Sequence, residues 1–360
     1  MTPLNERRLA NFKANRRGYY SLWIFTTLFT LSLFAEFIAN DAPIVFSKGG
    51  ELHFPVLFTY TETELGGELG SPANYRDPYV MNLIEADDGW AIWPLVRYSH
   101  FTIDWAIEGA TPSPPSAEHL LGTDGLGVDV LAKLLYGFRL SVLFGLSLTI
   151  ISSLVGVTVG AIQGYFGGMI DLVGQRVVEI WAGVPVLFAL IILASIVEPN
   201  VFMLIAILAM FSWMALVGVV RAEFLRARNF DFVRAARALG VSNSTIMRKH
   251  VLPNAAVATL TFVPFLLNGS ITTLTALDFL NFGLPYGSPS LGHLLSEAKD
   301  NLQAPWIGIT VFITLATMLT VLIFVGEAVR DALDPRRSMA AISQASGASP
   351  VSMTSSGSSD

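Results

Sequence analysis

The stretch LSVLFGLSLTIISSLVGVTVGAI, residues 140–162, carries no charged residue at any position. An apolar run of about 20 residues is long enough to cross the hydrocarbon core of a bilayer as a helix. The run contains Gly156 and Gly160, and Gly164 follows at the same four-residue spacing. Small residues at this spacing allow two helix backbones to approach closely in lipid. The stretch therefore predicts a membrane-spanning helix that packs tightly against another helix.

The composition of the whole chain agrees with a membrane protein. Hydrophobic residues make up 52% of the 360 positions and charged residues 14%, whereas a typical soluble domain is about 25% charged. A soluble domain would still need a charged surface, so this composition indicates a chain solvated mainly by lipid. The apolar runs predict six membrane-spanning helices, at residues 19–39, 140–162, 177–197, 201–221, 256–279 and 306–328.

The distribution of Lys and Arg predicts the orientation of these spans. Basic residues concentrate in the N-terminal segment 1–18, in the loop 222–255 and after the last span, from Arg330 onward. Six spans place all three segments on one side, which the positive-inside rule identifies as cytoplasmic. Both termini are then predicted to be cytoplasmic. The run at 19–39 is longer than the apolar region of a signal peptide, about 7–15 residues, so we interpret it as a retained anchor.

Two further segments complete the domain organisation. Residues 40–118 hold only three basic residues among many acids, and they predict a small extracytoplasmic insert between the first and second spans. Residues 119–337 then form the membrane core, which includes the cytoplasmic loop 222–255. Residues 338–360 are small, polar and unpatterned, which predicts a disordered Ser-rich tail.

The sequence lacks the motifs of the common catalytic sites. It has no cysteine, and therefore no disulfide, thiol nucleophile or cysteine metal site. It contains no G-x-x-x-x-G-K-[ST] phosphate loop, no H-E-x-x-H and no G-x-S-x-G. The five histidines have no metal-ligand spacing. We therefore expect no catalytic residue and no bound metal in this chain, which favours a transport or interaction subunit over an enzyme.

The ionisable residues inside the predicted spans are few, and they lie near span ends: Glu36, Glu179, Asp278 and Glu327. An ion-coupled secondary transporter would place carboxylates near the membrane midplane. Their absence there weighs against ion-coupled transport but leaves it open as an alternative.

The fifth predicted span carries a polar stripe. Asn268, Thr272 and Thr275 are spaced i, i+4 and i+7, which places them on one face of a helix. Such a stripe can line a hydrated translocation path. It can equally form hydrogen bonds to its own helix backbone or to neighbouring helices.

The most unusual segment is DFVRAARALGVSNSTIMRKHVLPN, residues 231–254, which is polar and basic although it lies between two apolar runs. The pattern predicts two short helices joined at Gly240, since glycine suits the left-handed backbone that ends a helix. Ser242 is placed to cap the second helix, and Pro253 to end it.

The first of these helices is predicted to be amphipathic. Phe232, Ala236 and Leu239 fall on one face, and Arg234 and Arg237 on another. An amphipathic helix pair at a membrane surface is suited to docking a cytoplasmic partner. Two alternatives are a plain positively charged loop and a DNA-binding helix-turn-helix, whose small residue, glycine and second helix the segment also shows. The flanking spans weigh against the latter, because they hold the segment beside a bilayer and away from a major groove.

The segment resembles the EAA loop of bacterial ABC-importer permeases, in which E-A-A-x-x-x-G is followed by nine residues and I-x-L-P. Ala235, Ala236, Gly240, Leu252 and Pro253 match at that spacing. Arg234 replaces the Glu of the general pattern, as in the peptide-transporter branch, and His250 replaces the Ile.

Two other stretches strengthen the resemblance. LLGTDGLGVDVLAKLLYGFRLSVLFG, residues 120–145, is similar to the segment before the second span of dipeptide and oligopeptide permeases, with Val128 where an Arg is usual. GEAVRDALDPR, residues 326–336, is similar to their C-terminal signature. With the large insert, the chain looks closest to the microcin C and oligopeptide importer permeases over about residues 16–337.

This resemblance implies an all-α integral membrane protein of the six-span ABC-importer permease type, located in the bacterial inner membrane. Its implied partners are a second homologous permease subunit, two ATPase domains on one chain or two, and a periplasmic peptide-binding protein, with no nucleic acid. ATP and Mg²⁺ would be bound by the ATPase partners, so this chain would carry no cofactor. The implied ATPase-coupling residues are Arg234, Ala235, Ala236, Arg237, Leu239, Gly240, Val241, Ser242, Leu252 and Pro253.

Overall fold

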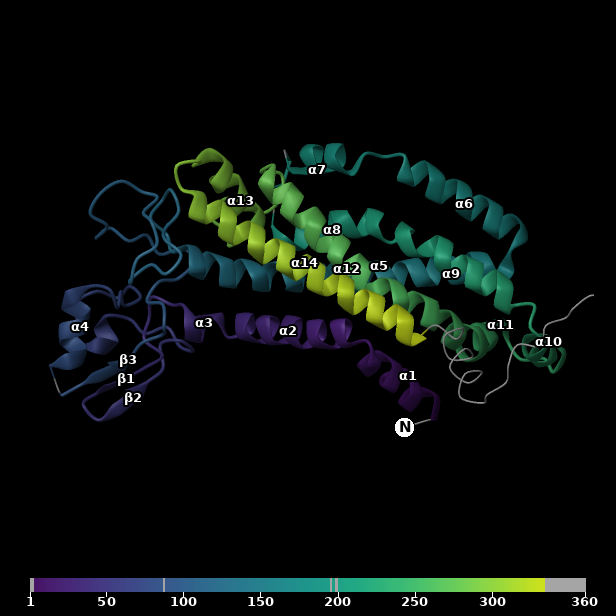
Figure 1. Cartoon of the computed structure of the whole chain (residues 1–360), viewed down its shortest axis with the longest axis horizontal. Helices are drawn as coiled ribbons and strands as arrows, with labels where there is room; N and C mark the ends of the chain where they lie inside the picture. The colour runs from purple at the N-terminus through teal and green to yellow at the C-terminus, as the bar shows by residue number, and fades with distance from the viewer. Residues whose placement is uncertain (1–2, 87, 195, 198–199, 334–360) are drawn as a thin grey trace, which may run out of the picture.

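The computed structural model describes residues 3–86, 88–194, 196–197 and 200–333. The protein is an elongated bundle of helices with a small mixed α/β insert at one end (Figure 1). The predicted disordered tail 338–360 lies outside the described residues.

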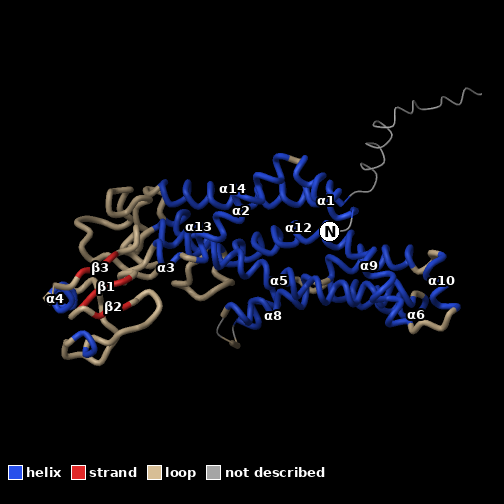
Figure 2. Tube along the Cα trace, turned by 90° about the horizontal axis from the view of Figure 1, so that it is seen from below, coloured by secondary structure: helices blue, strands red, loops and turns tan. Residues whose placement is uncertain are grey.

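Long helices run roughly along the same axis and form the body of the bundle (Figures 1 and 2). They are α2 (Arg16–Leu33), α5 (Val130–Phe166), α9 (Met214–Ala227), α12 (Leu252–Phe279) and α14 (Pro305–Leu333). The other helices are α1 (Pro3–Ala14), α3 (Ala35–Ile38), α4 (Pro78–Glu85), α6 (Gly168–Ala182), α7 (Val186–Ala194), α8 (Val201–Ser212), α10 (Asp231–Ala238), α11 (Asn243–Thr245) and α13 (Leu291–Asp300).

Four helical stretches of the described chain are long and apolar enough to cross a membrane. They are Val130–Phe166, Val201–Ala227, Asn243–Phe279 and Pro305–Leu333. They contain the spans predicted at 140–162, 201–221, 256–279 and 306–328, and each extends beyond the prediction at one or both ends. The extensions contain charged or polar residues, such as Lys133 and Arg139 at the start of α5, and the helix continues through them.

The span predicted at 177–197 is broken in the structure. Helix α6 ends at Ala182 and α7 begins at Val186, and their axes are bent by 64°. Pro185 lies in the break. It supplies no backbone N–H and disfavours helical geometry in the residue before it, so the helix ends there. A pair bent in this way is either one broken span or a re-entrant loop, so the described chain has four candidate spans, or five if the pair is one span.

The span predicted at 19–39 is the least apolar of the six. Helix α2 is 18 residues long and starts with Arg16 and Arg17, so its apolar part is shorter than the helix. A break at Phe34 separates it from α3. Helix α2 is not among the four stretches named above, and the total of six spans stays a prediction.

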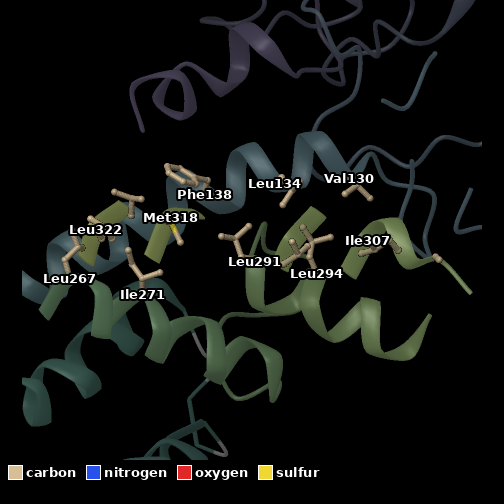
Figure 3. Close-up of a cluster of buried hydrophobic side chains, with 13 residues drawn as sticks. Val130, Leu134, Phe138, Leu267, Ile271, Leu291, Leu294, Ile307, Met318 and Leu322 are labelled. Atoms are coloured by element: carbon tan, nitrogen blue, oxygen red, sulfur yellow. The ribbon is translucent and has the colours of Figure 1, made fainter. Parts of the chain in front are cut away.

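The main hydrophobic core lies where α5, α12, α13 and α14 meet. Phe138 of α5, Ile271 of α12, Leu291 of α13 and Met318 of α14 are buried together there (Figure 3). This core fixes the short helix α13 between two of the long ones. It lies in the half of the bundle nearer the insert (Figures 1 and 3).

The glycines of α5 pack against α9, as their spacing predicts. A Cβ added to Gly156 would lie 2.5 Å from the carbonyl oxygen of Trp213, and one added to Gly164 would lie 2.5 Å from that of Arg221. These distances are shorter than a carbon atom permits, so only glycine allows this approach. The close contact of α5 with α9 is therefore confirmed.

The insert has a hydrophobic core of its own. Strands β1 (Val45–Lys48), β2 (Glu51–His53) and β3 (Trp90–Ile92) form an antiparallel sheet in the order β2-β1-β3. Phe46 of β1 packs with Val80 and Ile84 of α4 in this core. The segment between the first two long helices is thus a small folded unit at one end of the bundle (Figures 1 and 2).

Candidate coupling site and its links to the bundle

The helix pair predicted around Gly240 is present at the end of the bundle away from the insert (Figure 1). Gly240 has φ +76. Its N–H donates to Arg237 O at 3.0 Å, and the N–H of Val241 donates to Ala236 O at 3.1 Å. These two bonds form the Schellman motif that ends a helix with a left-handed glycine. The helix end predicted at Gly240 is confirmed.

One face of α10 packs against the bundle. Val233 and Ala236 are buried with Phe224 of α9 and with Ala161 and Tyr165 of α5. Of the three residues predicted to share the apolar face, Phe232, Ala236 and Leu239, only Ala236 is buried on the bundle. The buried side of the helix carries Val233, one position after Phe232, together with Ala236, and it packs on α5 and α9.

The remaining apolar residues of α10 point away from the bundle. Leu239 is 83% exposed and Phe232 is 45% exposed. Arg234 and Ala235 are exposed beside them. Apolar side chains grouped at an exposed helix end and flanked by charge are typical of a protein contact surface. We call this group, Phe232, Arg234, Ala235 and Leu239, the outer face of α10.

The second helix of the pair differs from the prediction. Ser242 caps α11 as expected, since its Oγ accepts from the N–H of Thr245 at 3.4 Å. Pro253 was predicted to end this helix, and that prediction is wrong: the helix continues from Asn243 to Phe279. A π-helical turn at Ile246–Val251 precedes the proline. The wider turn makes room for the proline ring and its missing N–H, so Leu252 and Pro253 begin α12.

Tyr165, near the C-terminal end of α5, joins both helices of the pair. Its hydroxyl donates to Asn243 Oδ1 at 2.8 Å. The guanidinium of Arg237 lies 5.5 Å from the centre of its ring, a cation–π distance. The sequence reading missed this residue, and its only signal was a tyrosine at the end of an apolar run.

The polar stripe of α12 is only partly accessible. Asn268 donates from Nδ2 to Leu319 O of α14 at 3.0 Å, so it serves helix packing. Thr272 and Thr275 bond to their own helix backbone, at Asn268 O and Ile271 O respectively. Thr275 is half-buried, whereas Thr272 and the neighbouring Thr273 are exposed. The surface available to line a path is therefore Thr272 with Thr273.

A buried charge network, which the sequence reading also missed, ties the insert to α5. His119 lies 2.9 Å through Nδ1 from Asp129 Oδ2, and 3.3 Å through Nε2 from Asp104 Oδ2. Asp129 also caps α5, because its Oδ1 accepts from the N–H of Ala132 at 2.8 Å. Asp104 accepts from Arg76 Nη2 at 3.0 Å and from the hydroxyl of Tyr98 at 2.9 Å. Because both imidazole nitrogens face carboxylates, the ring is suited to carry a positive charge.

The pKa shifts in this network have opposite signs. Burial acts to lower the pKa of His119, but the hydrogen bonds and charges of Asp129 and Asp104 outweigh it and raise that pKa. Burial acts to raise the pKa of Asp104, but its hydrogen bonds from the Ala106 N–H, Tyr98 and His119, with the charge of Arg76, lower it. Each shift means that the charged form of the group is stabilised by folding.

We therefore expect the insert to loosen from α5 as the pH rises. A His whose pKa is raised by folding contributes its full stabilisation at a pH below its unfolded pKa of about 6.5. This stabilisation is lost as the pH rises through the higher pKa of the folded state. Protonation of Asp104 weakens the network only at acid pH, below the pKa of about 3.9 that an Asp has in the unfolded chain. Protease cleavage of the loop 105–118 should be faster in His119→Gln than in the parent at pH 6, and the two rates should converge by pH 9.

A ratio of cleavage rates that stays constant between pH 6 and 9 would contradict this account. His53→Gln is the matched control, because His53 lies in the same insert and has no carboxylate at ion-pair distance among the described residues. The ratio of the cleavage rate of this variant to that of the parent should not change between pH 6 and 9.

A second ion cluster joins the entry of α5 to α13. Lys133 pairs with Asp124 and with Glu297 Oε1, the latter at 3.1 Å. The carboxylate of Asp124 also accepts from the N–H groups of Leu126 and Val128, at 2.8 and 2.9 Å. Within the stretch 120–145, residues 124–128 thus form a turn held by Asp124, which positions the first residues of α5. Val128, in the place of the usual Arg, is buried in this turn.

Long apolar helices, with a surface helix pair packed onto the ends of α5 and α9, define this protein as a multi-span membrane protein. The family model described as "Binding-protein-dependent transport system inner membrane component" matches residues 156–339. The chain belongs to this family, that of ABC transporter permeases.

Relatives of known name cover nearly all of the chain. It is 57% identical over 339 residues to the inner membrane ABC transporter permease protein YejE of Escherichia coli, covering 94% of this chain and 99% of that one. It is 55% identical over 360 residues to the peptidoglycan transport system permease protein YejE of Agrobacterium fabrum, covering 93% and 94%. It is 37% identical over 251 residues to the oligopeptide transport system permease protein OppC of Mycobacterium tuberculosis, covering 68% and 84%.

These findings confirm the resemblance to ABC-importer permeases. The protein is an inner-membrane permease, a transport subunit and not an enzyme, and membership of this family implies ATPase partners and a substrate-binding protein. An ion-coupled transporter and a DNA-binding regulator have no support from the comparisons.

Proposed function

We propose that this chain is the permease subunit of an ATP-driven importer of oligopeptides or peptide-like compounds of the microcin C kind. It forms half of the translocation path and docks an ATPase through α10. The observation that carries the docking proposal is the two-sided geometry of α10, with Val233 and Ala236 buried on the bundle and Leu239 83% exposed. The peptide cargo is supported by relatives at 55% and 37% identity whose names specify peptidoglycan and oligopeptide transport.

The contacts of α10 provide a route for rigid-body coupling. A displacement of α10 acts on Phe224 of α9 and on Tyr165 of α5, because these residues share one buried cluster with Val233. The glycine contacts hold α5 and α9 together, so the two helices move as a unit. ATP-driven closure of the docked ATPase domains would tilt this unit and open the path outward, and hydrolysis would reset it. Movement of packed elements against an interface is an established mode of switching.

The proposed assembly has six spans, with α2 as the first and the bent α6–α7 pair as the third. Both termini and α10 lie in the cytoplasm, and residues 40–118 lie in the periplasm, where a peptide-binding protein delivers cargo. A second homologous permease supplies the other half of the path. The absence of any buried residue in α6 is consistent with a surface that is covered by lipid or by this partner.

The proposal is tested by transport in proteoliposomes that contain the whole assembly. Uptake of an oligopeptide should require ATP and the binding protein, and it should persist when ion gradients are collapsed. Uptake driven by an ion gradient without ATP would contradict it.

Thr272 supplies a test of the path. Thr272→Leu should reduce ATP-dependent peptide uptake several-fold while the complex still assembles, since it replaces an exposed hydroxyl by a larger apolar side chain. Thr158→Leu on α5 is the matched control, because Thr158 is also exposed and also bonds to a carbonyl four residues earlier. Equal uptake by the two variants would assign Thr272 to helix packing alone.

A further inference from the structure

An apolar groove lies at the end of the bundle away from the insert, and none of the roles above uses it. Its volume is about 390 Å³. Three helices line it with apolar side chains: Phe12 of α1, Leu260, Val263 and Pro264 of α12, and Val329 and Leu333 of α14. Figures 1 and 2 show α1 beside this end of α14. Walls of this composition suit a hydrocarbon ligand, because burial of apolar surface is favourable.

The wall formed by α1 is held in place by the start of α2. Asn15 caps α2, since its Oδ1 accepts from the N–H of Gly18 at 3.2 Å. Its Nδ2 donates to Asp331 Oδ2 of α14 at 3.4 Å. A Cβ added to Gly18 would overlap the Cβ of Ala328, so the start of α2 lies directly against α14. The groove therefore lies between helices whose relative positions are fixed by contacts outside it.

The two segments that form these walls carry an excess of positive charge. Residues 3–17 and 325–333 hold six basic residues against three acidic ones. Arg8 precedes Phe12 by one turn and lies on the same face of α1. Arg330 lies in the last turn of α14. Among the described residues, neither arginine forms an ion pair, so both charges at the groove remain available to an anion.

An anionic phospholipid combines the two properties that the groove requires, since its acyl chains are apolar and its phosphate is negative. Helices α12 and α14 both belong to stretches that are long and apolar enough to cross a membrane. Acyl chains therefore surround these walls when the protein is in a bilayer. Basic groups at the cytoplasmic ends of membrane-spanning helices are typical binding sites for anionic headgroups.

Two other occupants match the groove less well. A helix is about 10–12 Å across with its side chains, so a groove of this volume holds about one turn of it. The tail 338–360 of this chain consists mainly of small and polar residues, which gain little from an apolar groove. Neither occupant supplies the negative charge that Arg8 and Arg330 favour.

We propose that this groove binds one anionic phospholipid. An acyl chain fills the space between Phe12 and Val263, and the phosphate lies at Arg8 and Arg330. The proposal goes beyond the transported cargo, and it rests on the proposed function only for the topology that makes this end of the bundle cytoplasmic. Helix α12 continues without a break from Asn243, so the lipid contacts the helix that also carries the second part of the coupling site.

The charge of the site is tested by titrating the purified complex with phosphatidylglycerol and with phosphatidylcholine of the same acyl chains. Native mass spectrometry counts the bound lipids. Arg8→Gln should weaken phosphatidylglycerol binding at one site about fivefold, the effect of one Lys or Arg beside an anionic lipid. Binding of phosphatidylcholine should not change. Arg248→Gln is the matched control, because Arg248 is also exposed to solvent but lies about 18 Å along the helix from Leu260.

The apolar part of the site is tested by Val263→Phe. The larger side chain occupies the groove, so one site should be lost for both lipids. Val257→Phe is the matched control, because Val257 lies on the same helix and is also half-buried but does not line the groove. Glycerol phosphate, the soluble part of the headgroup, should not displace the bound lipid, because it makes none of the apolar contacts.

Several results would overturn the proposal. Equal phosphatidylglycerol binding by the parent, Arg8→Gln and Val263→Phe would show that the groove holds no lipid. An equal loss in Arg8→Gln and Arg248→Gln would assign the binding to general surface charge, and displacement by glycerol phosphate would assign it to a free phosphate. Lipid bound only by a chain that ends at Arg337 would assign the groove to the tail. A partner subunit lost in Val263→Phe, with lipid binding unchanged, would assign it to a protein contact.

The ATPase seen in the same spectra separates this inference from the proposed function. A complex that keeps its ATPase but shows no effect of Arg8→Gln or Val263→Phe refutes the lipid site alone. A chain that purifies without any ATPase refutes the proposed function, whatever lipid it binds.

Discussion

Gly240→Asp should abolish ATPase retention and peptide uptake while the chain still inserts into the membrane. Gly240 has φ +76, and an added Cβ would meet no atom within 4 Å in this chain. The left-handed backbone costs a non-glycine residue about 1–2 kcal/mol, and the new carboxylate lies next to the outer face of α10. Both effects change the orientation or the charge of the proposed docking surface. Co-purification from mild detergent and uptake in vesicles measure the result.

Gly287→Asp provides a matched control for this experiment. Gly287 also has a positive φ, of +90, and open space around an added Cβ, but it lies in the loop between α12 and α13. The two substitutions add the same charge and comparable backbone strain at positions remote from each other in the fold. We expect Gly287→Asp to keep the ATPase. If both variants keep it, or both lose it, α10 is not the specific docking element.

The double substitution Gly160→Ala and Gly164→Ala should strongly destabilise the permease. A Cβ at Gly160 would lie 2.8 Å from Val217 O, and one at Gly164 would lie 2.6 Å from the Cβ of Phe224. Both clashes are with parts of α9 that cannot rotate away, so α5 and α9 must separate. Overpacking of this kind costs about 1–3 kcal/mol per site. A thermal-unfolding midpoint several degrees lower in detergent is the expected result.

Gly218→Ala on α9 isolates the packing effect. It makes the same chemical change inside a helix, but an added Cβ meets no atom within 4 Å. Alanine is favoured over glycine within a helix by about 1 kcal/mol, so this variant should be as stable as the parent or more so. A Gly160/Gly164 variant of equal stability would show that the close approach of α5 and α9 is not required.

The local features of this fold are readable from the sequence. The glycine spacing in 140–164 predicts close helix contact, because a small residue every fourth position creates one smooth face. Gly240 predicts a helix end, because a left-handed residue is needed there. Each of these depends on residues a few positions apart.

The errors arise where a neighbouring element decides the outcome. Val233, which was not among the residues assigned to the apolar face of α10, is buried because α5 and α9 pack against its side of the helix. Pro253 does not end the helix because the π-helical turn at Ile246–Val251 accommodates the proline ring and its missing N–H. A hydrophobic pattern or a proline alone does not reveal either event.

The charge network of the insert lies beyond sequence reasoning for a different reason. Asp104, His119 and Asp129 come from the insert, the loop before α5 and the cap of α5. No spacing rule relates such positions, so they become visible only in three dimensions.

The central claim, that the outer face of α10 contacts an ATPase, is tested most directly by a crosslink from Leu239. The chain contains no cysteine, so Leu239→Cys introduces a single thiol at a position that is 83% exposed. Leu302→Cys is the control, since Leu302 is 82% exposed but lies between α13 and α14, remote from α10 (Figure 1). A short thiol-to-amine crosslinker applied to the native complex should join position 239 to the ATPase and leave position 302 free of that product. No ATPase adduct at 239, or equal adducts at both positions, would contradict the account.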